Sequence, residues 1–374
     1  HKIYDIQCSK SYPTRSITLK IALTADNHLT TKAKNPERFS ALADIFQQCG
    51  ANQIQLLIIA GDLFDQSMVN YAEFEDLYKS YRPNDLTTVI IPGNHDLQLN
   101  QGAIAGDGLI VYSEPVLKPL NDSRKILFLP YQGAQTMGKA IAPFAEDLDG
   151  QRWILIGHGD WSSGINSPDP YEQGVYMPLT SMDLKNYQPE MVFLGHIHLP
   201  QDGNIVFYPG SPCPINITET GIRRFLILDT DRGEISSKPV NSQLVYFDER
   251  FVMLPMEHDL KHLTTKIQER IKSWNLPSGW NKYVQVRVKV TGSALSDRQK
   301  ILDSVKRAFA PFAFYQDGDP DISELIHNPD PERAEIANQV QAWIMEHPWD
   351  ERAYHPSKDQ ILEEALKLIY QAGK

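Results

Sequence analysis

The chain has 374 residues and a formal net charge of −11. It exceeds the ~250–300 residues at which a single hydrophobic core stops growing, so we expect two domains or one domain with appendages. Its apolar runs are far shorter than the ~20 residues that span a bilayer, and we expect neither a membrane-spanning helix nor a signal peptide. The negative net charge argues against nucleic-acid binding through the overall charge of the protein, since phosphate contacts need Lys and Arg. It does not exclude a groove that is locally basic.

Five short apolar segments each read as a buried strand that ends at potential metal ligands. In chain order they are Leu19–Thr24, Leu56–Ala60, Val89–Ile91, Trp153–Ile156 and Met191–Leu194. They are followed, respectively, by Asp26 and His28, by Asp62, by Asn94-His95-Asp96, by His158, and by His196 and His198. A single Asp after a strand is commonly a cap or turn residue. Ligand sites of open α/β sheets lie outside the carboxyl ends of the strands, so five such blocks in order predict that these side chains converge.

Helices and further strands are expected between these blocks. Pro36–Cys49 has apolar residues at helical spacing, which predicts a βαβ unit with the first two strands. Tyr71–Tyr81 is predicted as a second helix with one apolar face. Short strands at 125–129, 205–208 and 225–228 would complete a second sheet. The expected fold class is α/β, a sandwich of two mixed sheets flanked by helices with the site at one edge.

From about Gln243 the pattern changes to that of a small, separate α/β unit. We predict a strand at 244–254, a helix at 259–274, a strand at 283–290 with alternating valines, and a helix at 296–308. Beyond residue 318 the chain is acidic and rich in Pro, with helices predicted at 332–346 and 358–371. The last helix carries an apolar stripe of Ile361, Leu362, Ala365, Leu366 and Ile369. The predicted divisions are therefore residues 1–240, 241–318 and 319–374.

The seven candidate ligands form a mixed oxygen and imidazole set. They are Asp26, His28, Asp62, Asn94, His158, His196 and His198. This composition suits Mn²⁺, Fe, Zn²⁺ or Mg²⁺ and disfavours thiolate-binding metals. A structural zinc site is usually closed by about four ligands, often including Cys. Seven ligands without a nearby Cys instead fit two ions about 3.5–4 Å apart that share a carboxylate, clamp a phosphoryl group and supply hydroxide for in-line attack. The predicted chemistry is phosphoester hydrolysis.

The same blocks resemble the motifs of the calcineurin-like metallophosphoesterases, over about residues 18–230. Four phrases are also similar to those of SbcD-type DNA-repair exonucleases, namely Thr24-Ala25-Asp26-x-His28-Leu29, Gly61-Asp62-Leu63-Phe64-Asp65, Gly195-His196-Ile197-His198 and Tyr208-Pro209-Gly210-Ser211-Pro212. The resemblance implies a metallophosphoesterase sandwich and a capping domain, 241–318, that restricts the DNA reaching the site. It further implies that the tail docks on an SbcC-type SMC-like ATPase and that 71–81 helps to pair two protomers. Packing of either segment on its own chain is the alternative.

Residue roles carried over from the resemblance divide the ligands into two groups. Asp26, His28 and His198 would hold one ion, and Asn94, His158 and His196 the other, with Asp62 bridging. Two divalent ions are expected, with Mn²⁺ as the preferred metal and Mg²⁺, Fe or Zn²⁺ as alternatives. His95 would lie over the phosphate and stabilise charge or protonate the leaving oxygen, while Asp96 orients its ring. An exposed turn histidine is the alternative for His95.

Two acidic residues near these motifs receive no catalytic role. Some members of the broader nuclease family carry a His where this chain has Asp65, so a histidine's role in positioning phosphate is not carried over to Asp65. The alternative for Asp65 is the N-cap of a helix over Gln66–Tyr71. Asp160 is expected to be a turn residue, with orientation of a ligand His as the other interpretation.

The preferred functional hypothesis is a two-metal DNA nuclease that processes ends in double-strand-break repair, as a homodimer with an SbcC-type ATPase. A phosphodiesterase or phosphatase for nucleotides or other small phosphoesters is the alternative that the acidic balance favours. A DNA-end tether or scaffold is a third hypothesis. Cys8, Cys49 and Cys213 are few and unpatterned, which fits a reducing cytoplasm. Candidate phosphate contacts are Arg38, Arg82, Arg124, Lys125, Arg223 and Arg224, for each of which a solvated surface charge is the preferred interpretation.

Overall fold

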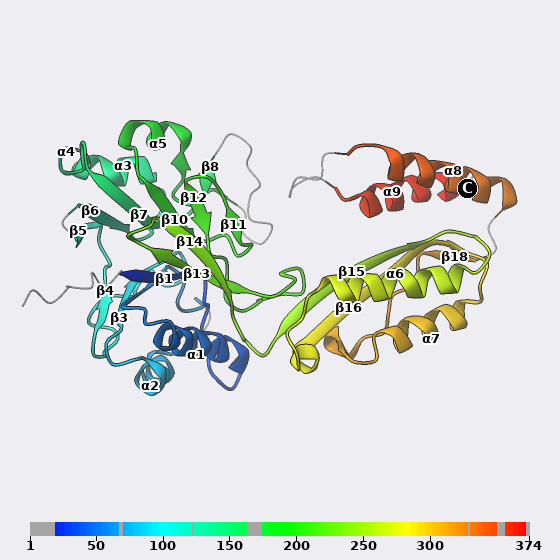
Figure 1. Cartoon of the computed structure of the whole chain (residues 1–374), viewed down its shortest axis with the longest axis horizontal. Helices are drawn as coiled ribbons and strands as arrows, with labels where there is room; N and C mark the ends of the chain where they lie inside the picture. The colour runs from blue at the N-terminus through cyan, green and yellow to red at the C-terminus, as the bar shows by residue number, and fades with distance from the viewer. Residues whose placement is uncertain are drawn as a thin grey trace, which may run out of the picture.

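Two six-stranded sheets stacked on each other form the larger part of the computed structural model, which describes residues 19–66, 70–121, 123–162, 174–327, 330–349 and 356–371 (Figure 1). The first sheet contains, in order, β14 (Glu234–Pro239), β13 (Arg224–Asp229), β1 (Lys20–Thr24), β2 (Leu56–Ala60), β3 (Thr87–Ile91) and β4 (Leu109–Val111). The second contains, in order, β11 (Gln201–Asp202), β12 (Val206–Tyr208), β10 (Met191–Gly195), β7 (Arg152–His158), β6 (Arg124–Leu129) and β5 (Val116–Asn121). Helices cover the outer faces of both sheets.

The central strands are apolar throughout because both of their faces are buried. In β2, Leu57 and Ile59 pack under the helices of the first sheet, whereas Ile58 and Ala60 pack in the core between the sheets. The helices over the first sheet are α1 (Pro36–Ala51) and α2 (Tyr71–Tyr81), and those beside the second are α3 (Met137–Ile141), α4 (Ala145–Leu148) and α5 (Ser181–Tyr187). A short pair, β8 (Trp161–Ser162) and β9 (Leu179–Thr180), adjoins α5.

The predicted α/β sandwich of two mixed sheets is confirmed, but the strand predicted at 225–228 (β13) pairs with β1 in the first sheet and not in the second. Parallel pairs β1–β2, β2–β3 and β7–β10 carry the predicted ligand blocks at their carboxyl ends, and antiparallel β13, β14 and β5 make the sheets mixed. The sequence pattern did not predict the edge strands β14 and β5. Both are largely exposed, so they lack the apolar alternation that marks a half-buried strand.

Residues from 245 onward build a third sheet with its own hydrophobic core. Its strands pair in parallel, and Phe247 stacks on Trp274 at a ring distance of 3.8 Å. The elements are β15 (Val245–Met253), α6 (Asp259–Ser273), β16 (Val284–Ala294), α7 (Arg298–Ala308), β17 (Ala313–Phe314) and β18 (Leu325–His327), with 3₁₀ turns at Trp280–Tyr283 and Tyr315–Asp317. Another 3₁₀ turn, Ala142–Phe144, lies between α3 and α4 in the two-sheet body. The predicted strand–helix–strand–helix order is confirmed, and the short strands β17 and β18 were not predicted.

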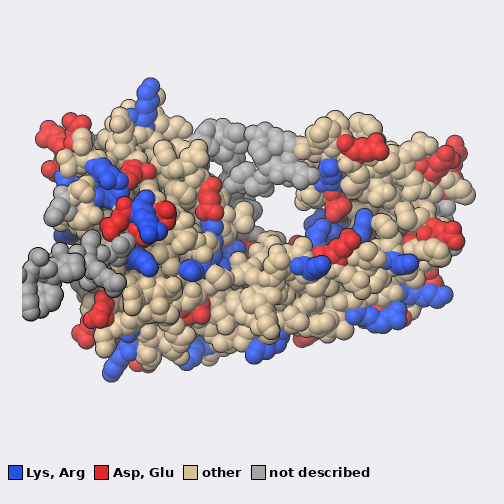
Figure 2. Space-filling view, in the orientation of Figure 1, with Lys and Arg blue, Asp and Glu red and all other residues tan. Residues whose placement is uncertain are grey.

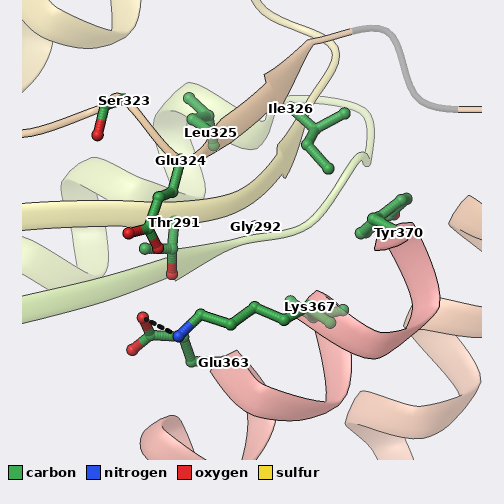
Figure 3. Close-up of a pocket in the computed structure, with 10 residues that line it drawn as sticks. Thr291, Gly292, Ser323, Glu324, Leu325, Ile326, Glu363, Lys367 and Tyr370 are labelled. Atoms are coloured by element: carbon green, nitrogen blue, oxygen red, sulfur yellow. Dashed lines mark ion pairs between the residues drawn. The ribbon is translucent and has the colours of Figure 1, made fainter. Parts of the chain in front are cut away.

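The tail forms a helical hairpin of α8 (Pro331–Glu346) and α9 (Lys358–Gln371) over one end of the third sheet. Leu362 and Leu366 of the apolar stripe are buried against α8 and against Val252 of β15. The stripe therefore packs on its own chain, which was one of its two interpretations. A cavity of about 600 Å³ remains between α9 and the strands β16 and β18, beside the ion pair of Lys367 with Glu363 (Figure 3).

The surface of the protein carries charges of both signs. Figure 2 shows acidic and basic side chains interspersed over the visible face, with a recess between the two-sheet body and the unit that follows it. Near the junction, the Gly221 N–H donates to the Tyr246 carbonyl at 2.9 Å. Within the described ranges, we find no helix with the length and apolar character needed to cross a membrane.

Asp259 joins the start of α6 to the loop between β16 and α7. Its carboxylate accepts from the backbone N–H groups of Leu295 (2.8 Å), Ser296 (2.9 Å) and Leu260 (2.7 Å), and from the Ser296 hydroxyl. Burial alone would raise the pKa of Asp259, but these hydrogen bonds, led by those from Ser296, hold it below its usual value. The stabilising contribution is thus present above the unfolded pKa of about 3.9 and is lost as pH falls through the folded pKa.

We expect Asp259→Ala to lower the free energy of unfolding by about 1–3 kcal/mol, because buried donors lose their acceptor. Urea denaturation followed by tryptophan fluorescence would measure it, since Trp274 lies in the same core. Asp303→Ala, which removes an exposed acid from α7, is the matched control. Equal midpoints for the two variants at neutral pH would contradict this role of Asp259.

Candidate metal centre

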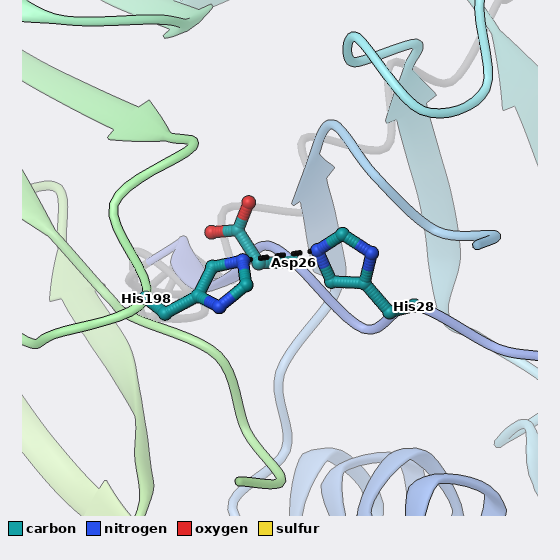
Figure 4. Close-up of side chains that lie close together, drawn as sticks. All are labelled: Asp26, His28 and His198. Carbon is teal, nitrogen blue, oxygen red and sulfur yellow. Dashed lines mark hydrogen bonds between the residues drawn. The ribbon is translucent and has the colours of Figure 1, made fainter. Parts of the chain in front are cut away.

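All seven predicted ligands lie at the carboxyl ends of β1, β2, β3, β7 and β10. Ligand atoms of Asp26, His28 and His198 lie within 4.8 Å of one another. Figure 4 shows His28 and His198 approaching from two different strands, with their Nε2 atoms 3.0 Å apart. The structure therefore brings together one of the two groups that the family resemblance predicted.

The second group surrounds the side-chain amide of Asn94. Its Oδ1 atom lies 2.9 Å from His158 Nε2 and 3.2 Å from His196 Nδ1. Asp62 lies between the groups, because its Oδ2 atom is 3.8 Å from His28 Nε2 and 3.3 Å from His158 Nε2. This position is the one that a bridging carboxylate requires, and the bridging role itself remains a prediction.

The ligands are presented by strained backbone just beyond the strand ends. Asp26, His28, Asp62 and His196 have φ values of 55°, 46°, 50° and 98°. Such left-handed conformations cost of order 1–3 kcal/mol each for residues other than Gly, and they concentrate at functional sites. Cross-strand hydrogen bonds hold them, since Asp26 N–H donates to Gly61 O at 3.1 Å and His28 N–H donates to Asp62 O at 3.0 Å.

Glycines permit the close approach of the ligands. Gly61 has a φ of +90°, and a Cβ added there would lie 2.0 Å from His158 Nδ1. The same His158 nitrogen lies 2.9 Å from the Ala60 carbonyl and donates to it, which directs Nε2 toward Asn94 and Asp62. A side chain at position 61 would therefore displace the His158 ring from the ligand cluster.

We expect Gly61→Ala to reduce bound metal and activity together, because His158 has to move away from its partners. Metal content of the purified variant, measured after dialysis against Mn²⁺, would test this. Gly133→Ala is the matched control, because Gly133 also has a positive φ (+67°) but a Cβ there would meet nothing within 4 Å. A Gly61→Ala protein with wild-type metal content would contradict the close contact.

His95 lies at the edge of the cluster. Its ring centroid is 4.7 Å from that of His28 in an edge-to-face arrangement, and its backbone N–H donates to Asp62 Oδ1 at 2.8 Å. Asp96 accepts hydrogen bonds from the N–H groups of Gly93 (2.7 Å) and Phe64 (3.2 Å). These bonds of Asp96 hold the loop that carries Asn94 and His95, and a ring-orienting role for Asp96 stays a prediction.

Burial and mutual charge shift the pKa values of the ligands in opposite directions. Burial would lower the pKa of His158, but the charges of Asp62 and Asp26 raise it to about 10. Burial would raise the pKa of Asp62, but the charge and hydrogen bond of His158 hold it well below its usual range. Burial lowers the pKa of His28 to about 3.

The residues fit divalent cations. The Oδ2 atom of Asp26 is buried and has no hydrogen-bond partner within the part of the chain that the structure describes. The facing Nε2 atoms of His28 and His198 each offer a lone pair in one tautomer. A cation bound at these atoms would satisfy all three groups, and carboxylate, amide and imidazole ligands together suit a divalent first-row metal.

Three acidic residues near the site received no catalytic role or were not predicted. Asp160 lies in the short connection between β7 and β8, where its N–H donates to Tyr176 O, its carbonyl accepts from Leu179 N–H, and its carboxylate lies 3.8 Å from His196 Nε2. Asp65 lies 3.5 Å from Arg38, and α2 begins at Tyr71 with Asn70 as its cap, while part of the stretch 66–71 that Asp65 was predicted to cap lies outside the described residues. Glu219 was not predicted, although it lies 3.0 Å from His198 Nδ1. It follows no apolar run, so no local pattern marked it.

The six basic residues considered as phosphate contacts are all engaged within the protein. Three of them, at positions 38, 124 and 223, are buried. The contacts are Arg38 with His28 O, Arg82 with Leu86 O, Arg124 with Glu190, Lys125 with Asp147 O, Arg223 with Ser211 O and Arg224 with Asp202. They therefore hold the fold together, and none of them provides support for a phosphate-binding groove.

The two-sheet body is similar to known metallophosphoesterases. Residues 19–200 match the family model of calcineurin-like phosphoesterases. The uncharacterised metallophosphoesterase YhaO of Bacillus subtilis is 24% identical over 213 residues, which cover 53% of this chain and 51% of YhaO. The chain thus spans about half the length of the curated relative it matches.

Similar solved structures include a dimetal phosphatase from Danio rerio and an archaeal phosphodiesterase. The first has a TM-score of 0.40 and 10% identity, covering 60% of this chain and 96% of its own. The second has a TM-score of 0.32 and 14% identity, covering 59% of this chain and 99% of its own.

Proposed function

Since residues 19–200 match the calcineurin-like phosphoesterases and a distant relative supports that superfamily, we propose that the protein is a two-metal phosphodiesterase that cleaves DNA. The family match supports metal-dependent hydrolysis of phosphoesters directly. The single observation that carries the proposal is the convergence of two ligand groups on Asp62, with His95 beside them.

The residues of the chain have separable parts in this reaction. Two divalent ions, when bound, clamp the oxygens of a phosphoryl group and activate water. His95 can hold a proton near the leaving oxygen, because its ring lies beside His28 at the margin of the cluster. Arg38 and Arg223 donate to the carbonyls of His28 and His198, so they hold the backbone of both ligands in place.

We propose DNA as the substrate for two reasons, which are the sequences of the motifs and the small domain that follows the two-sheet body. The phrases around Asp62 and Tyr208 resemble those of SbcD-type nucleases, and a small α/β unit with a helical hairpin follows the two-sheet body. Mn²⁺ is the proposed metal, because the ligand set combines oxygen donors with imidazoles.

A nuclease assay on end-labelled DNA in Mn²⁺, Mg²⁺ or Zn²⁺ tests this proposal. We expect cleavage of DNA and of bis-p-nitrophenyl phosphate in Mn²⁺, with much slower hydrolysis of the monoester p-nitrophenyl phosphate. Protein that leaves every DNA substrate intact while it hydrolyses small phosphodiesters would rule out the nuclease. Protein that hydrolyses none of these would also rule out the phosphodiesterase.

A second candidate, a phosphodiesterase or phosphatase for nucleotides or other small phosphoesters, is favoured by the charges. The chain has a net charge of −11, and the six candidate cations near the two-sheet body are engaged internally. A small substrate needs no basic groove, whereas DNA binding draws on several Lys and Arg contacts. A strong preference for the monoester in the same assay would favour a phosphatase.

We also propose that the α8–α9 hairpin docks on an SbcC-type ATPase and that α2 pairs two copies of the chain. Trp343 and Leu368 of the hairpin are 62% and 71% exposed, and Tyr81 of α2 is 42% exposed. These residues remain accessible although the apolar stripe is covered. Light scattering of the purified protein tests the dimer, and loss of ATPase binding in Trp343→Glu tests the docking surface.

A further inference from the structure

Glu219 is a buried carboxylate directly behind a predicted metal ligand. It lies between β12 and β13, and only 4% of its surface is exposed. Its Oε1 atom accepts a hydrogen bond from His198 Nδ1 at 3.0 Å. The opposite ring nitrogen of His198, Nε2, faces His28 in the cluster. The imidazole is therefore held between the carboxylate and the position where a metal ion would bind.

The carboxylate of Glu219 is itself fixed by the loop that carries it. Its Oε2 atom accepts from the Ser211 hydroxyl at 2.9 Å and from Ile215 N–H at 3.1 Å. Its Oε1 atom also accepts from Asn216 Nδ2 at 3.1 Å. With four donors around two oxygens, the side chain has little freedom to rotate, so it can hold His198 in a single orientation.

Arg223 holds the backbone of His198 in place. Its guanidinium, which is 2% exposed, donates to the carbonyls of His198 and Ser211 and to the Ser211 hydroxyl. His198 is therefore held at its backbone by Arg223 and at its ring by Glu219. Glu219 is the residue of this network that contacts the imidazole itself.

We propose that Glu219 is a positioning residue for the metal centre, which sets the tautomer and ring angle of His198. A carboxylate that accepts from Nδ1–H leaves the lone pair on Nε2, makes the imidazole a stronger ligand and fixes its plane. Loss of such a partner commonly costs about 10–100-fold in metal affinity. The inference rests on the proposed two-metal function, and it assigns Glu219 to the ion held by Asp26, His28 and His198.

The test is a calorimetric titration of chelator-treated protein with MnCl₂. Glu219→Gln keeps the size of the side chain but removes the charge that strengthens the bond to His198. We expect one of the two Mn²⁺ ions to bind about 10–100-fold more weakly, and the other to be unchanged. We also expect excess MnCl₂ to restore turnover, because a positioning residue acts through the ion. Wild-type affinity for both ions in a folded Glu219→Gln variant would overturn the proposal.

Two controls separate positioning from damage to the fold. Ser211→Ala removes the hydroxyl that donates to Glu219 and accepts from Arg223, but it keeps the carboxylate that contacts His198. Glu249→Gln makes the same substitution as Glu219→Gln at a buried glutamate in the third sheet. Both should lower the unfolding temperature of metal-free protein, and both should change Mn²⁺ affinity less than Glu219→Gln does. An equal loss of affinity in Glu249→Gln would assign the effect to general destabilisation of the protein and overturn the role of Glu219.

Two further outcomes complete the test. If Glu219→Gln does not fold, Glu219→Asp is the variant to measure, because its shorter side chain keeps the charge but moves it away from His198. Unchanged Mn²⁺ affinity in Glu219→Asp would overturn the proposal. Wild-type protein that binds no Mn²⁺ would instead overturn the proposed function on which the inference rests.

Discussion

Replacing Asp62 by Asn is expected to weaken both metal ions at once and to abolish activity. The amide keeps the shape of the side chain but removes the formal charge, and Asp62 Oδ2 lies within 4 Å of a histidine from each ligand group. Only a carboxylate offers two oxygens with enough charge to hold two dications close together. Loss of a residue that only hydrogen-bonds a metal ligand commonly lowers metal affinity by ~10–100-fold. Loss of the ligand Asp62 itself should lower the affinity by more than that.

Metal analysis by mass spectrometry after dialysis against Mn²⁺ would measure this effect. His158→Ala is the matched comparison, because His158 belongs to the group with Asn94 and His196 and should weaken mainly one ion. Two ions per chain in the wild type, fewer than one in Asp62→Asn and about one in His158→Ala are the expected values. Equal loss of a single ion in both variants would contradict the bridging position of Asp62.

Replacing His95 by Ala is expected to remove the chemistry while leaving both ions in place. The backbone N–H of residue 95 donates to Asp62 Oδ1, and the Ala variant retains this bond, whereas it loses the ring nitrogen that lies within 4.8 Å of the ligand atoms of His28 and Asp62. Removal of a general acid commonly lowers the turnover number by about 10²–10⁴-fold. Steady-state hydrolysis of bis-p-nitrophenyl phosphate together with metal analysis of the same sample would show whether the two effects separate.

His262→Ala provides the control for the His95 prediction. His262 is exposed on α6 in the third-sheet unit, so its removal should change neither turnover nor metal content. Equal rates of the wild type and His95→Ala would contradict a catalytic role for His95. That outcome would favour the hypothesis of a DNA-end tether or scaffold with metals that serve the structure.

The sandwich and the ligand cluster could be predicted from the sequence because they depend on short-range patterns. A strand such as Leu56–Ala60, buried on both faces, is apolar throughout, and the residue that follows it necessarily reaches the edge of the sheet. The helices after residue 243 were predictable for the same reason, since their apolar faces repeat at the helical period.

The parts that could not be predicted depend on contacts between distant segments. Glu219 acts on His198 only because the loop before β13 folds back to the end of β10. The exposed edge strands β5 and β14 have no apolar alternation to reveal them. Whether Arg38 or Arg223 faces solvent or a ligand's carbonyl is likewise set by the fold, because nothing in the neighbouring residues distinguishes the two.

The origin of the ligands has a consequence for how the two sheets stay together. Asp26, His28, Asp62 and Asn94 follow strands of the first sheet, whereas His158, His196 and His198 follow or end strands of the second. Ions bound between them would act as cross-links, so their binding free energy would also oppose separation of the sheets. An ion present at 100 times its dissociation constant stabilises a native state by about 2.7 kcal/mol. Metal availability would thus regulate how long the protein survives heat and proteases, as well as how fast it works.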